Sequence, residues 1–419
     1  MSLNVSGHNI SDIYVGDDKI DKIFFGDDLV YTASNPAEYY LGFHPNNLSE
    51  VCTVKLYQFI TEGAVWSQFF EPKPVMPTFQ YSYDCKTWQA YTLGTTLSIG
   101  GSNPQAVYFK GDNLSPWYGT YSDSSHSYET YAQFVLSGSV AASGNIMSLR
   151  YSDPTDTNNT TIPCVGAFSY LFYGCTSLTS SPVLPATTLA NKCYWNMFYE
   201  CASLATAPLL PATTLAEDCY FDLFLGCTSL TSPPVLPATT LARGCYQAMF
   251  RDCTSLATAP TLPATTLANS CYANMFYGCT SLTAPPVLPA TTLAELCYWG
   301  MFAHCTFTSP PVLPATTLAP SCYDFMFAYC TSLTRIPKLN VLTIPDGGII
   351  GTYGGMYRYS NVRANSTSSG VCNKAYRIPT SGTGTCGSKD LDNMFTDLAG
   401  TGSFTPSINT TFYINVPSF

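Results

Sequence analysis

Cysteine is the residue with the most potential chemistry in this sequence, because a thiol can form a disulfide, bind a metal ion or remain reduced. The chain has 18 cysteines, and 12 of them stand in two columns of a repeat, eight positions apart within each repeat. The first column is Cys193, Cys219, Cys245, Cys271, Cys297 and Cys322, and the second is Cys201, Cys227, Cys253, Cys279, Cys305 and Cys330.

The spacing argues against both disulfides and metal binding. Two helical residues eight positions apart lie about 12 Å apart along the axis, whereas a disulfide needs Cα atoms within about 7 Å. Cysteines of one column are related by translation between repeats, so their Cβ vectors run parallel and do not face each other. The Cys-x-x-Cys or Cys/His spacing of metal sites is missing. We therefore expect buried, reduced thiols, no bound metal, and synthesis in a reducing cytoplasm.

Other catalytic groups are sparse. The four histidines, His8, His44, His126 and His304, lie far apart in the chain. The sequence contains no GxSxG elbow, HExxH or P-loop, and no GxGxxG motif on a predicted strand-to-helix turn. We expect a protein that is not an enzyme and needs no cofactor. A carbohydrate-active enzyme that uses two carboxylates is kept as a third alternative.

The cysteines belong to a repeat that must position them. LPATTLA begins at Leu184, Leu210, Leu236, Leu262, Leu288 and Leu313, in steps of 26 residues and once of 25. Leu189, Cys193, Met197 and Cys201 are four apart, which predicts one face of a two-turn helix. CTSLT and ATTL read as strands, and prolines mark two corners. The predicted fold class is a mixed α/β repeat, a leucine-rich-repeat solenoid with a 26-residue period.

The rest of the chain divides into three further parts. Residues 1–34 contain a duplicated strand and Gly-Asp-Asp turn, predicted to be a β attachment module. Residues 35–160 read as a β-sandwich-like domain that precedes the solenoid at 161–345, and residues 346–419 read as diverged repeats with a C-terminal cap. The attachment residues are the apolar ones of the duplicated strands: Ile13, Tyr14, Val15, Ile23, Phe24 and Phe25.

Binding residues are sought at the variable positions of the repeat, because its fixed positions form the core. Aromatic side chains with polar neighbours suit sugar rings or protein hot spots. The alternative is that these aromatics pack on adjacent repeats or on a neighbouring chain. The candidate ligand-binding surface comprises Trp195, Tyr199, Phe221, Tyr277, Trp299 and Tyr329.

Composition excludes several classes of protein. The net charge is −10 and only 11% of residues are charged, which argues against binding nucleic acid through its phosphates. No apolar run is long enough to span a membrane. The start, MSLNVSGHNI, shows no basic region and no apolar core, so we expect no secretory signal.

The run LPATTLAxxCYxxMFxGCTSLT resembles the BspA-type leucine-rich repeats of surface proteins from gut Bacteroidetes and their crAss-like phages. The resemblance covers about residues 165–340 and implies a right-handed solenoid with an adhesion or binding role. Residues 1–34 resemble N-terminal segments of phage fibre and baseplate-associated proteins, which join the rest of a virion through small strand modules.

These resemblances imply a virion fibre or decoration subunit that presents a leucine-rich-repeat surface to a host glycan or protein. We expect other virion proteins as partners through the N-terminus, a homotrimer, location in the virion, and neither nucleic-acid binding nor membrane insertion. The alternative is a bacterial cell-surface adhesin, which should carry a signal peptide or a lipoprotein cysteine.

Overall fold

The computed structural model describes most of the chain beyond residue 36. Side chains are described for residues 37–59, 75–119, 130–151, 153, 159–337, 339, 354–368, 370–378, 391, 393–395, 402–408 and 410–418. Backbone alone is described for residues 36, 60, 120–122, 127–129 and 396, and for six short strands between residues 3 and 32.

The six N-terminal strands form three successive antiparallel pairs. The pairs are β1 (Leu3–Val5) with β2 (His8–Ile10), β3 (Ile13–Val15) with β4 (Asp18–Ile20), and β5 (Lys22–Phe25) with β6 (Asp28–Thr32). The predicted attachment residues therefore stand on β3 and β5, and their side chains lie outside the described part of the chain.

Two sheets follow, after the 3-10 turn η1 (Pro36–Glu38), and all their strand pairs are antiparallel except β15 with β16. The six-stranded sheet has the order β10-β9-β12-β7-β15-β16, and the four-stranded sheet has the order β11-β8-β14-β13. Strands of the larger sheet are β7 (Leu41–Pro45), β9 (Phe79–Ser82), β10 (Gln89–Tyr91), β12 (Val107–Gly111), β15 (Val140–Ser143) and β16 (Leu178–Ser180). Strands of the smaller sheet are β8 (Cys52–Ile60), β11 (Thr96–Ile99), β13 (Gly119–Ser122) and β14 (Ser127–Ser137).

A shared aromatic core holds the two sheets together. Phe43 of β7 and Phe109 of β12 pack on Phe134 of β14, with ring centroids 4.7 and 5.3 Å apart. All three side chains are fully buried. The larger sheet continues into the repeats, because β15 pairs in parallel with β16. The 3-10 turn η2 (Ile146–Leu149), capped by Asn145, lies beside this junction.

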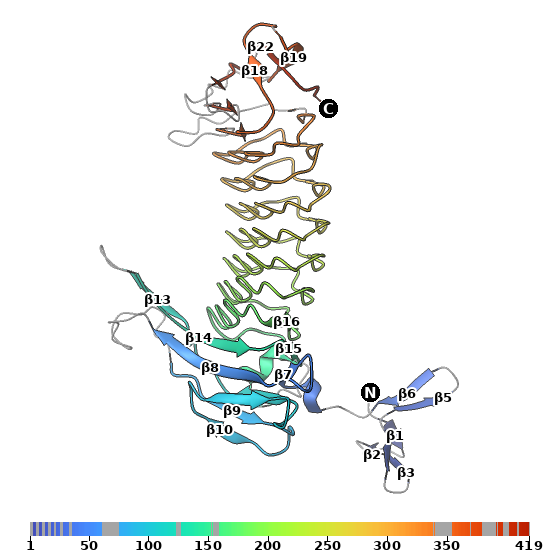
Figure 1. Ribbon diagram of the computed structural model, residues 1–419. Coiled ribbons are helices and arrows are strands. Elements are labelled where there is room, and N and C mark those ends of the chain that lie inside the picture. The colour runs from blue at the N-terminus through green and yellow to red at the C-terminus, as the bar shows by residue number, and fades with distance from the viewer. Residues whose placement is uncertain are drawn as a thin grey trace.

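Residues 160–337 form a column of stacked coils, with the two sheets at one end and the C-terminal strands at the other (Figure 1). Few of the coil residues belong to strands; instead, isolated parallel bridges join equivalent threonines of successive coils. Examples are Thr214 with Thr240 and Thr266 with Thr292. The ATTL segments therefore lie extended side by side, without forming long strands.

The segment between the two cysteine columns is a chain of turns, because every fourth residue has a positive φ. In the first full coil these are Lys192, Asn196 and Glu200, with φ of 56°, 54° and 53°. Backbone N–H groups then alternate in their partners. Met197 donates within its own turn to Tyr194, whereas Phe198 donates to Leu223 of the next coil.

The mixed α/β repeat and leucine-rich-repeat solenoid predicted from the spacing are therefore wrong. The described residues contain no α-helix, only the two 3-10 turns, and the coils do not close into alternating strand and helix layers. The physical reason is the left-handed residue at every fourth position, which cannot continue a right-handed helix. The four-residue period that indicated a helix is the period of these turns.

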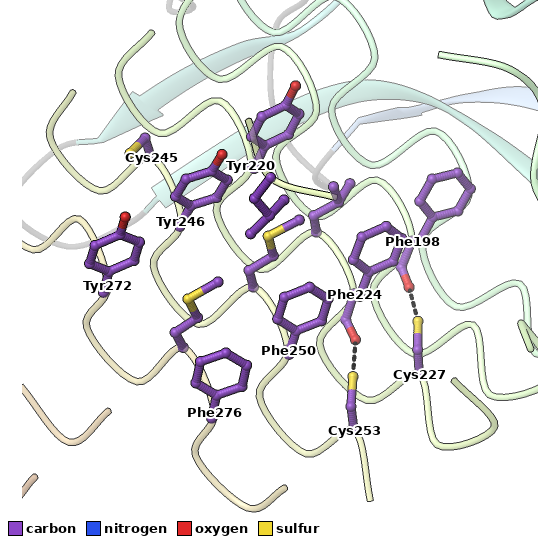
Figure 2. Packing of buried hydrophobic residues seen from close by; sticks show 14 of the residues in the cluster. Phe198, Tyr220, Phe224, Cys227, Cys245, Tyr246, Phe250, Cys253, Tyr272 and Phe276 are labelled. Atoms are coloured by element: carbon purple, nitrogen blue, oxygen red, sulfur yellow. Dashed lines mark hydrogen bonds between the residues drawn. The ribbon is translucent and has the colours of Figure 1, made fainter. Parts of the chain in front are cut away.

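The interior of the column is built from unbroken ladders of identical side chains (Figure 2). Stacked tyrosines run from Tyr194 to Tyr323 with centroids 5.7–6.0 Å apart. Stacked rings of the phenylalanine column run from Phe172 to Phe395, 5.2–5.9 Å apart. Such regular stacking buries the same apolar face in every coil.

The second cysteine column supplies hydrogen bonds to this interior. Cys227 donates to the carbonyl of Phe198 and Cys253 to that of Phe224, at 3.1 and 3.0 Å (Figure 2). All described cysteines are free, and those of both columns are buried. Burial raises the pKa of these thiols, which keeps them neutral.

The C-terminal part continues the column and then adds small sheets. β17 (Tyr357–Arg358) pairs in parallel with β20 (Phe395–Thr396), which also pairs with β21 (Ser403–Phe404). Tyr357 and Phe395 extend the phenylalanine ladder. A second sheet has the order β18-β22-β19, from β18 (Ala364–Asn365), β19 (Lys374–Arg377) and β22 (Thr411–Ile414). Cys386 lies outside the described residues.

Candidate functional site

The turns between the cysteine columns place side chains on the outside of the column in register from coil to coil. The variable residues immediately before the second cysteine of each coil are such positions. From the third full coil onward, they bring four rings and two guanidinium groups into one line. We call this set the aromatic ladder: Arg251, Tyr277, His304, Tyr329, Tyr359 and Arg358.

Successive rings of the aromatic ladder are in direct contact. The centroids of Tyr277 and His304 are 4.9 Å apart, and those of His304 and Tyr329 are 4.2 Å apart with planes 10° from parallel. Tyr329 then contacts Tyr359 at 4.9 Å. Tyr329 is 42% exposed, and the other three rings are half-buried. The ladder is thus continuous on the surface.

A guanidinium group lies over each terminal ring. Arg251 lies 4.5 Å from the centroid of Tyr277, and Arg358 lies 5.0 Å from that of Tyr359. These are cation–π contacts, in which the positive group meets the negative face of the ring. Arg251 also forms an exposed ion pair of 3.4 Å with Asp252. The ladder therefore ends in a guanidinium group on both sides, and the one at Arg251 is paired with Asp252.

Because neighbours occupy the ring faces, the ladder offers ring edges and polar tips to solvent. Aromatic edges carry partial positive charge, and phenol and imidazole groups donate and accept hydrogen bonds. The pKa of His304 is lowered, chiefly by burial, so the ring is neutral at pH 7. The surface suits a ligand rich in hydroxyl or carboxylate oxygen. Stacking of a sugar on an open ring face is not available here.

The structure brings only part of the predicted binding surface together. Tyr277 and Tyr329 lie in the aromatic ladder, with His304 between them. Tyr199 stacks instead on Tyr173, 4.6 Å away, several coils nearer the two sheets. Trp299 lies in a separate column, edge-on to Phe325 at 6.3 Å.

Trp195 and Phe221 form a third group near the base of the column. Trp195 packs against Tyr118, Tyr170 and Phe221, with centroids 5.6–5.8 Å apart. The Lys192 ammonium lies 4.6 Å over its ring. Trp195 is therefore a packing residue between the smaller sheet and the first coils, which is the alternative that the sequence left open.

Four residues of the aromatic ladder were not among the predicted binding residues: Arg251, His304, Arg358 and Tyr359. Arg251 and His304 occupy variable positions, but the predicted surface was restricted to Trp, Tyr and Phe. The sequence does contain one signal for this part of the ladder. His304, Tyr329 and Tyr359 occupy the same position in successive coils, immediately before Cys305, Cys330 and Ser360 respectively.

Two carboxyl groups outside the ladder have unusual environments. The pKa of Asp222 is raised to about 7, mainly by burial, and Arg251 opposes the shift. The pKa of Asp324 is raised to about 7 by burial, and hydrogen bonds from Trp299 and Phe325 oppose it. The two residues lie in coils separated by three others, so they do not form a catalytic pair.

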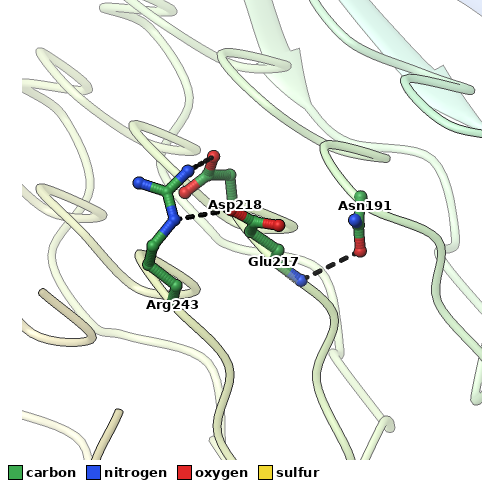
Figure 3. A network of polar contacts seen from close by, with 4 residues as sticks. All are labelled: Asn191, Glu217, Asp218 and Arg243. Carbon is green, nitrogen blue, oxygen red and sulfur yellow. Dashed lines mark hydrogen bonds and ion pairs between the residues drawn. The ribbon is translucent and has the colours of Figure 1, made fainter. Parts of the chain in front are cut away.

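A different column carries polar contacts between coils (Figure 3). Arg243 donates to Glu217 at 2.5 Å and to Asp218 at 3.4 Å, and the Glu217 N–H donates to Asn191 at 3.2 Å. Arg243 is 61% exposed, so the ion pair is screened by water and contributes little to stability. These residues join coils and do not form a pocket.

Among the described residues, no group of three or more His, Cys, Asp or Glu side chains is placed to hold a metal ion. No helix in the described part of the chain is long and apolar enough to cross a membrane. Comparison with known proteins finds no matching family, no matching curated protein and no matching solved structure.

Proposed function

We propose that this chain is a structural binding protein, a fibre or decoration subunit of a phage virion, which presents the aromatic ladder to a glycan or protein on the host cell. The observation that supports this proposal best is the ladder itself. Its rings and guanidinium groups form one continuous surface line over successive coils, from Arg251 to Tyr359.

The architecture suits such a role. Each coil donates backbone hydrogen bonds to the next, so the column is a stiff support for whatever lies on its surface. The ladder lies on the half of the column away from the two sheets, whereas the three strand pairs precede those sheets in the chain. In this proposal residues 1–34 join the virion, and the distal coils meet the host.

The chemistry of the ladder defines the ligand more closely. Ring edges, phenol hydroxyls and two guanidinium groups recognise oxygen-rich surfaces by hydrogen bonds and charge. Host-surface polysaccharides and acidic protein loops both present such oxygens. Rigid aromatic side chains also lose little conformational freedom on binding, and both aromatic residues and arginine are enriched at binding hot spots.

Binding to intact cells tests this proposal. The full chain, carrying a fluorescent label, is titrated onto gut Bacteroidetes isolates and compared with the double variant Tyr277→Ala/Tyr329→Ala. We expect the double variant to bind at least tenfold more weakly, because two hot-spot side chains are removed. Tyr199→Ala is the matched control, since this tyrosine stacks on a neighbouring coil outside the ladder. Equal binding of all three proteins would contradict the proposal.

A further inference from the structure

A second surface line, on the proline corners of the coils, is apolar and exposed. Each Pro-x-Leu-Pro corner buries its leucine and points the preceding residue outward. Leu236 is 1% exposed, for example, whereas Val235 is 67% exposed and Val287 is 81% exposed. We call this line the valine edge: Val183, Leu209, Val235, Thr261, Val287 and Val312.

The valine edge carries no charge. Residues 181–185, 207–211, 232–237, 259–263, 284–289 and 309–314 contain no Asp, Glu, Lys, Arg or His, although the chain has a net charge of −10. Its prolines have no N–H group, so another chain cannot extend the coils here by strand addition. An occupant of this edge must pack apolar side chains against it.

Two grooves lie between successive coils at the C-terminal end of the valine edge. A groove of about 670 Å³ lies between two coils and is lined by Pro285, Pro286, Val287, Pro310 and Val312, among others. A second groove, of about 460 Å³, lies one coil earlier and is lined by Pro260, Thr261 and Val287, among others. The stretch of the edge between residues 259 and 314 therefore has two hollows, one coil apart.

We propose that the valine edge is the interface with a second copy of this chain. A copy carries the same uncharged line with the same period, so the two lines can pack against each other along their length. Six coils at the strand spacing extend about 25 Å. A square interface patch of about 800 Å² per partner, the standard size, would be about 28 Å on a side. The length of the valine edge is therefore similar to the length of a standard interface. In an isologous pair both copies use the same edge, so the exposed apolar residues of both copies are covered.

The mass of the full chain in solution tests this inference without reference to any host ligand. The wild-type monomer has a mass of 45.5 kDa. We expect light scattering to give twice that value at micromolar concentration, which is a dimer and not the homotrimer implied by the resemblance to phage proteins. Val235→Asp/Val287→Asp should be monomeric at the same concentration, because two charges would be buried. Thr261→Val fills the one polar gap in the line, and we expect it to lower the dissociation constant severalfold.

A matched control separates the edge from a general effect of charge. Thr254→Asp/Thr280→Asp adds the same two charges at exposed threonines after the second cysteine column and should remain a dimer. Thermal unfolding of each variant shows that the column is intact. A monomeric wild type would overturn the inference and leave the edge to a different protein. A wild-type oligomer that survives Val235→Asp/Val287→Asp would overturn it in favour of another interface. A mass that grows without limit would exclude the isologous pair.

Discussion

At the scale of single residues, the column depends on contacts between aspartate or asparagine in one coil and glycine in the next. A Cβ atom added to Gly278 would overlap Asp252 Oδ1, and one added to Gly300 would overlap Asn274 Oδ1. Gly244 faces Asp218 in the same way. Both partners in each pair have a positive φ. In these three pairs, the glycine leaves room for the Asp or Asn oxygen of the preceding coil.

Gly278→Ala tests this pairing. We expect it to lower the free energy of unfolding more than Gly174→Ala, which changes the same position of an earlier coil. Their φ values are 72° and 67°, so both variants incur a similar left-handed penalty of about 1–2 kcal/mol. Nothing lies within 4 Å of a Cβ at Gly174. The overlap with Asp252 should add about 1–3 kcal/mol, measured by denaturant unfolding.

The double variant Asp252→Ala/Gly278→Ala completes this test. Removing the carboxyl group removes the overlap, so we expect the double variant to recover the added loss and match Gly174→Ala. If Gly278→Ala and Gly174→Ala lowered the free energy of unfolding equally, the contact between Asp252 and Gly278 would not contribute to stability.

Asp222→Asn should stabilise the protein at alkaline pH. The pKa of Asp222 is about 7 in the fold, against 3.8 ordinarily. Its contribution to stability is complete below about pH 4 and is lost as the pH rises through 7, because the buried group must then ionise. Asparagine is accepted at this position with positive φ in other coils, at Asn196 and Asn274.

The measurement is thermal unfolding at pH 8 and pH 4.5. We expect Asp222→Asn to raise the Tm by several degrees at pH 8 and by much less at pH 4.5. Asp112→Asn, at an exposed position, removes the same charge and serves as the control. A Tm difference that does not depend on pH would contradict the buried-carboxyl explanation.

At the scale of elements, the sequence predicts which residues are buried but not the backbone that buries them. The cysteine, methionine and phenylalanine columns do form the interior. The helix was wrong because a period of four is shared by one face of a helix and by consecutive turns with a left-handed residue. The distinguishing signal is Gly, Asn or Asp at every fourth position, as at Asp218, Asp222 and Gly226.

Removing one whole coil tests whether coils depend only on their neighbours. Deleting residues 210–235 joins Leu209 to Leu236 and keeps the remaining Asp–Gly and Asn–Gly pairs. Glu200 then faces Asp252, and its flexible side chain can move into solvent. We expect a folded protein with a Tm only a few degrees lower, since stability is a sum over coils and their interfaces.

Deleting residues 262–287 is the matched comparison. It removes the same length and keeps every interior column, but it places His304 where Gly278 met Asp252. We expect this variant to unfold at a clearly lower temperature than the first. If the two deletions were equally stable, the Asp–Gly pairing would not limit which coils can be neighbours.

At the scale of the whole molecule, the two sheets are the base of the column. Phe134 of β14 stacks on Phe172 of the first coil at 5.5 Å, and Phe43 of β7 lies 6.2 Å from the same ring. Arg150 is fully buried at this junction, with its guanidinium 3.4 Å from the centroid of Trp117. The sheets thus cover the end of the stack, which would otherwise expose its core.

Two truncations test this division of roles. We expect deletion of residues 1–34 to leave the Tm unchanged, because the shared core of the sheets and the column, among the residues whose side chains are described, begins at Leu41. Deletion of residues 1–151 removes the covering aromatic residues and should lower the Tm of the coils strongly or make them aggregate. Unfolding of the coils after the shorter deletion would show that the N-terminal strands are part of the core.

The candidate site could be predicted from the sequence only in part. Of the variable aromatic residues predicted from the sequence, Tyr277 and Tyr329 lie in the ladder. The remaining predicted aromatics fall into separate groups because the turns direct neighbouring positions onto different columns. The two arginines could not be selected, since their place in the ladder depends on contacts across coils that sequence spacing alone does not show.

Footprinting of the bound protein tests the central claim most directly. The full chain is oxidised by hydroxyl radicals, free and bound to polysaccharide extracted from a cell that it binds, and the modified residues are identified by mass spectrometry. We predict that protection is concentrated at Tyr277, His304, Tyr329 and Tyr359, with Tyr199 and Trp299 unchanged. Protection elsewhere on the bound chain, with these four residues still reactive, would contradict a binding role for the aromatic ladder.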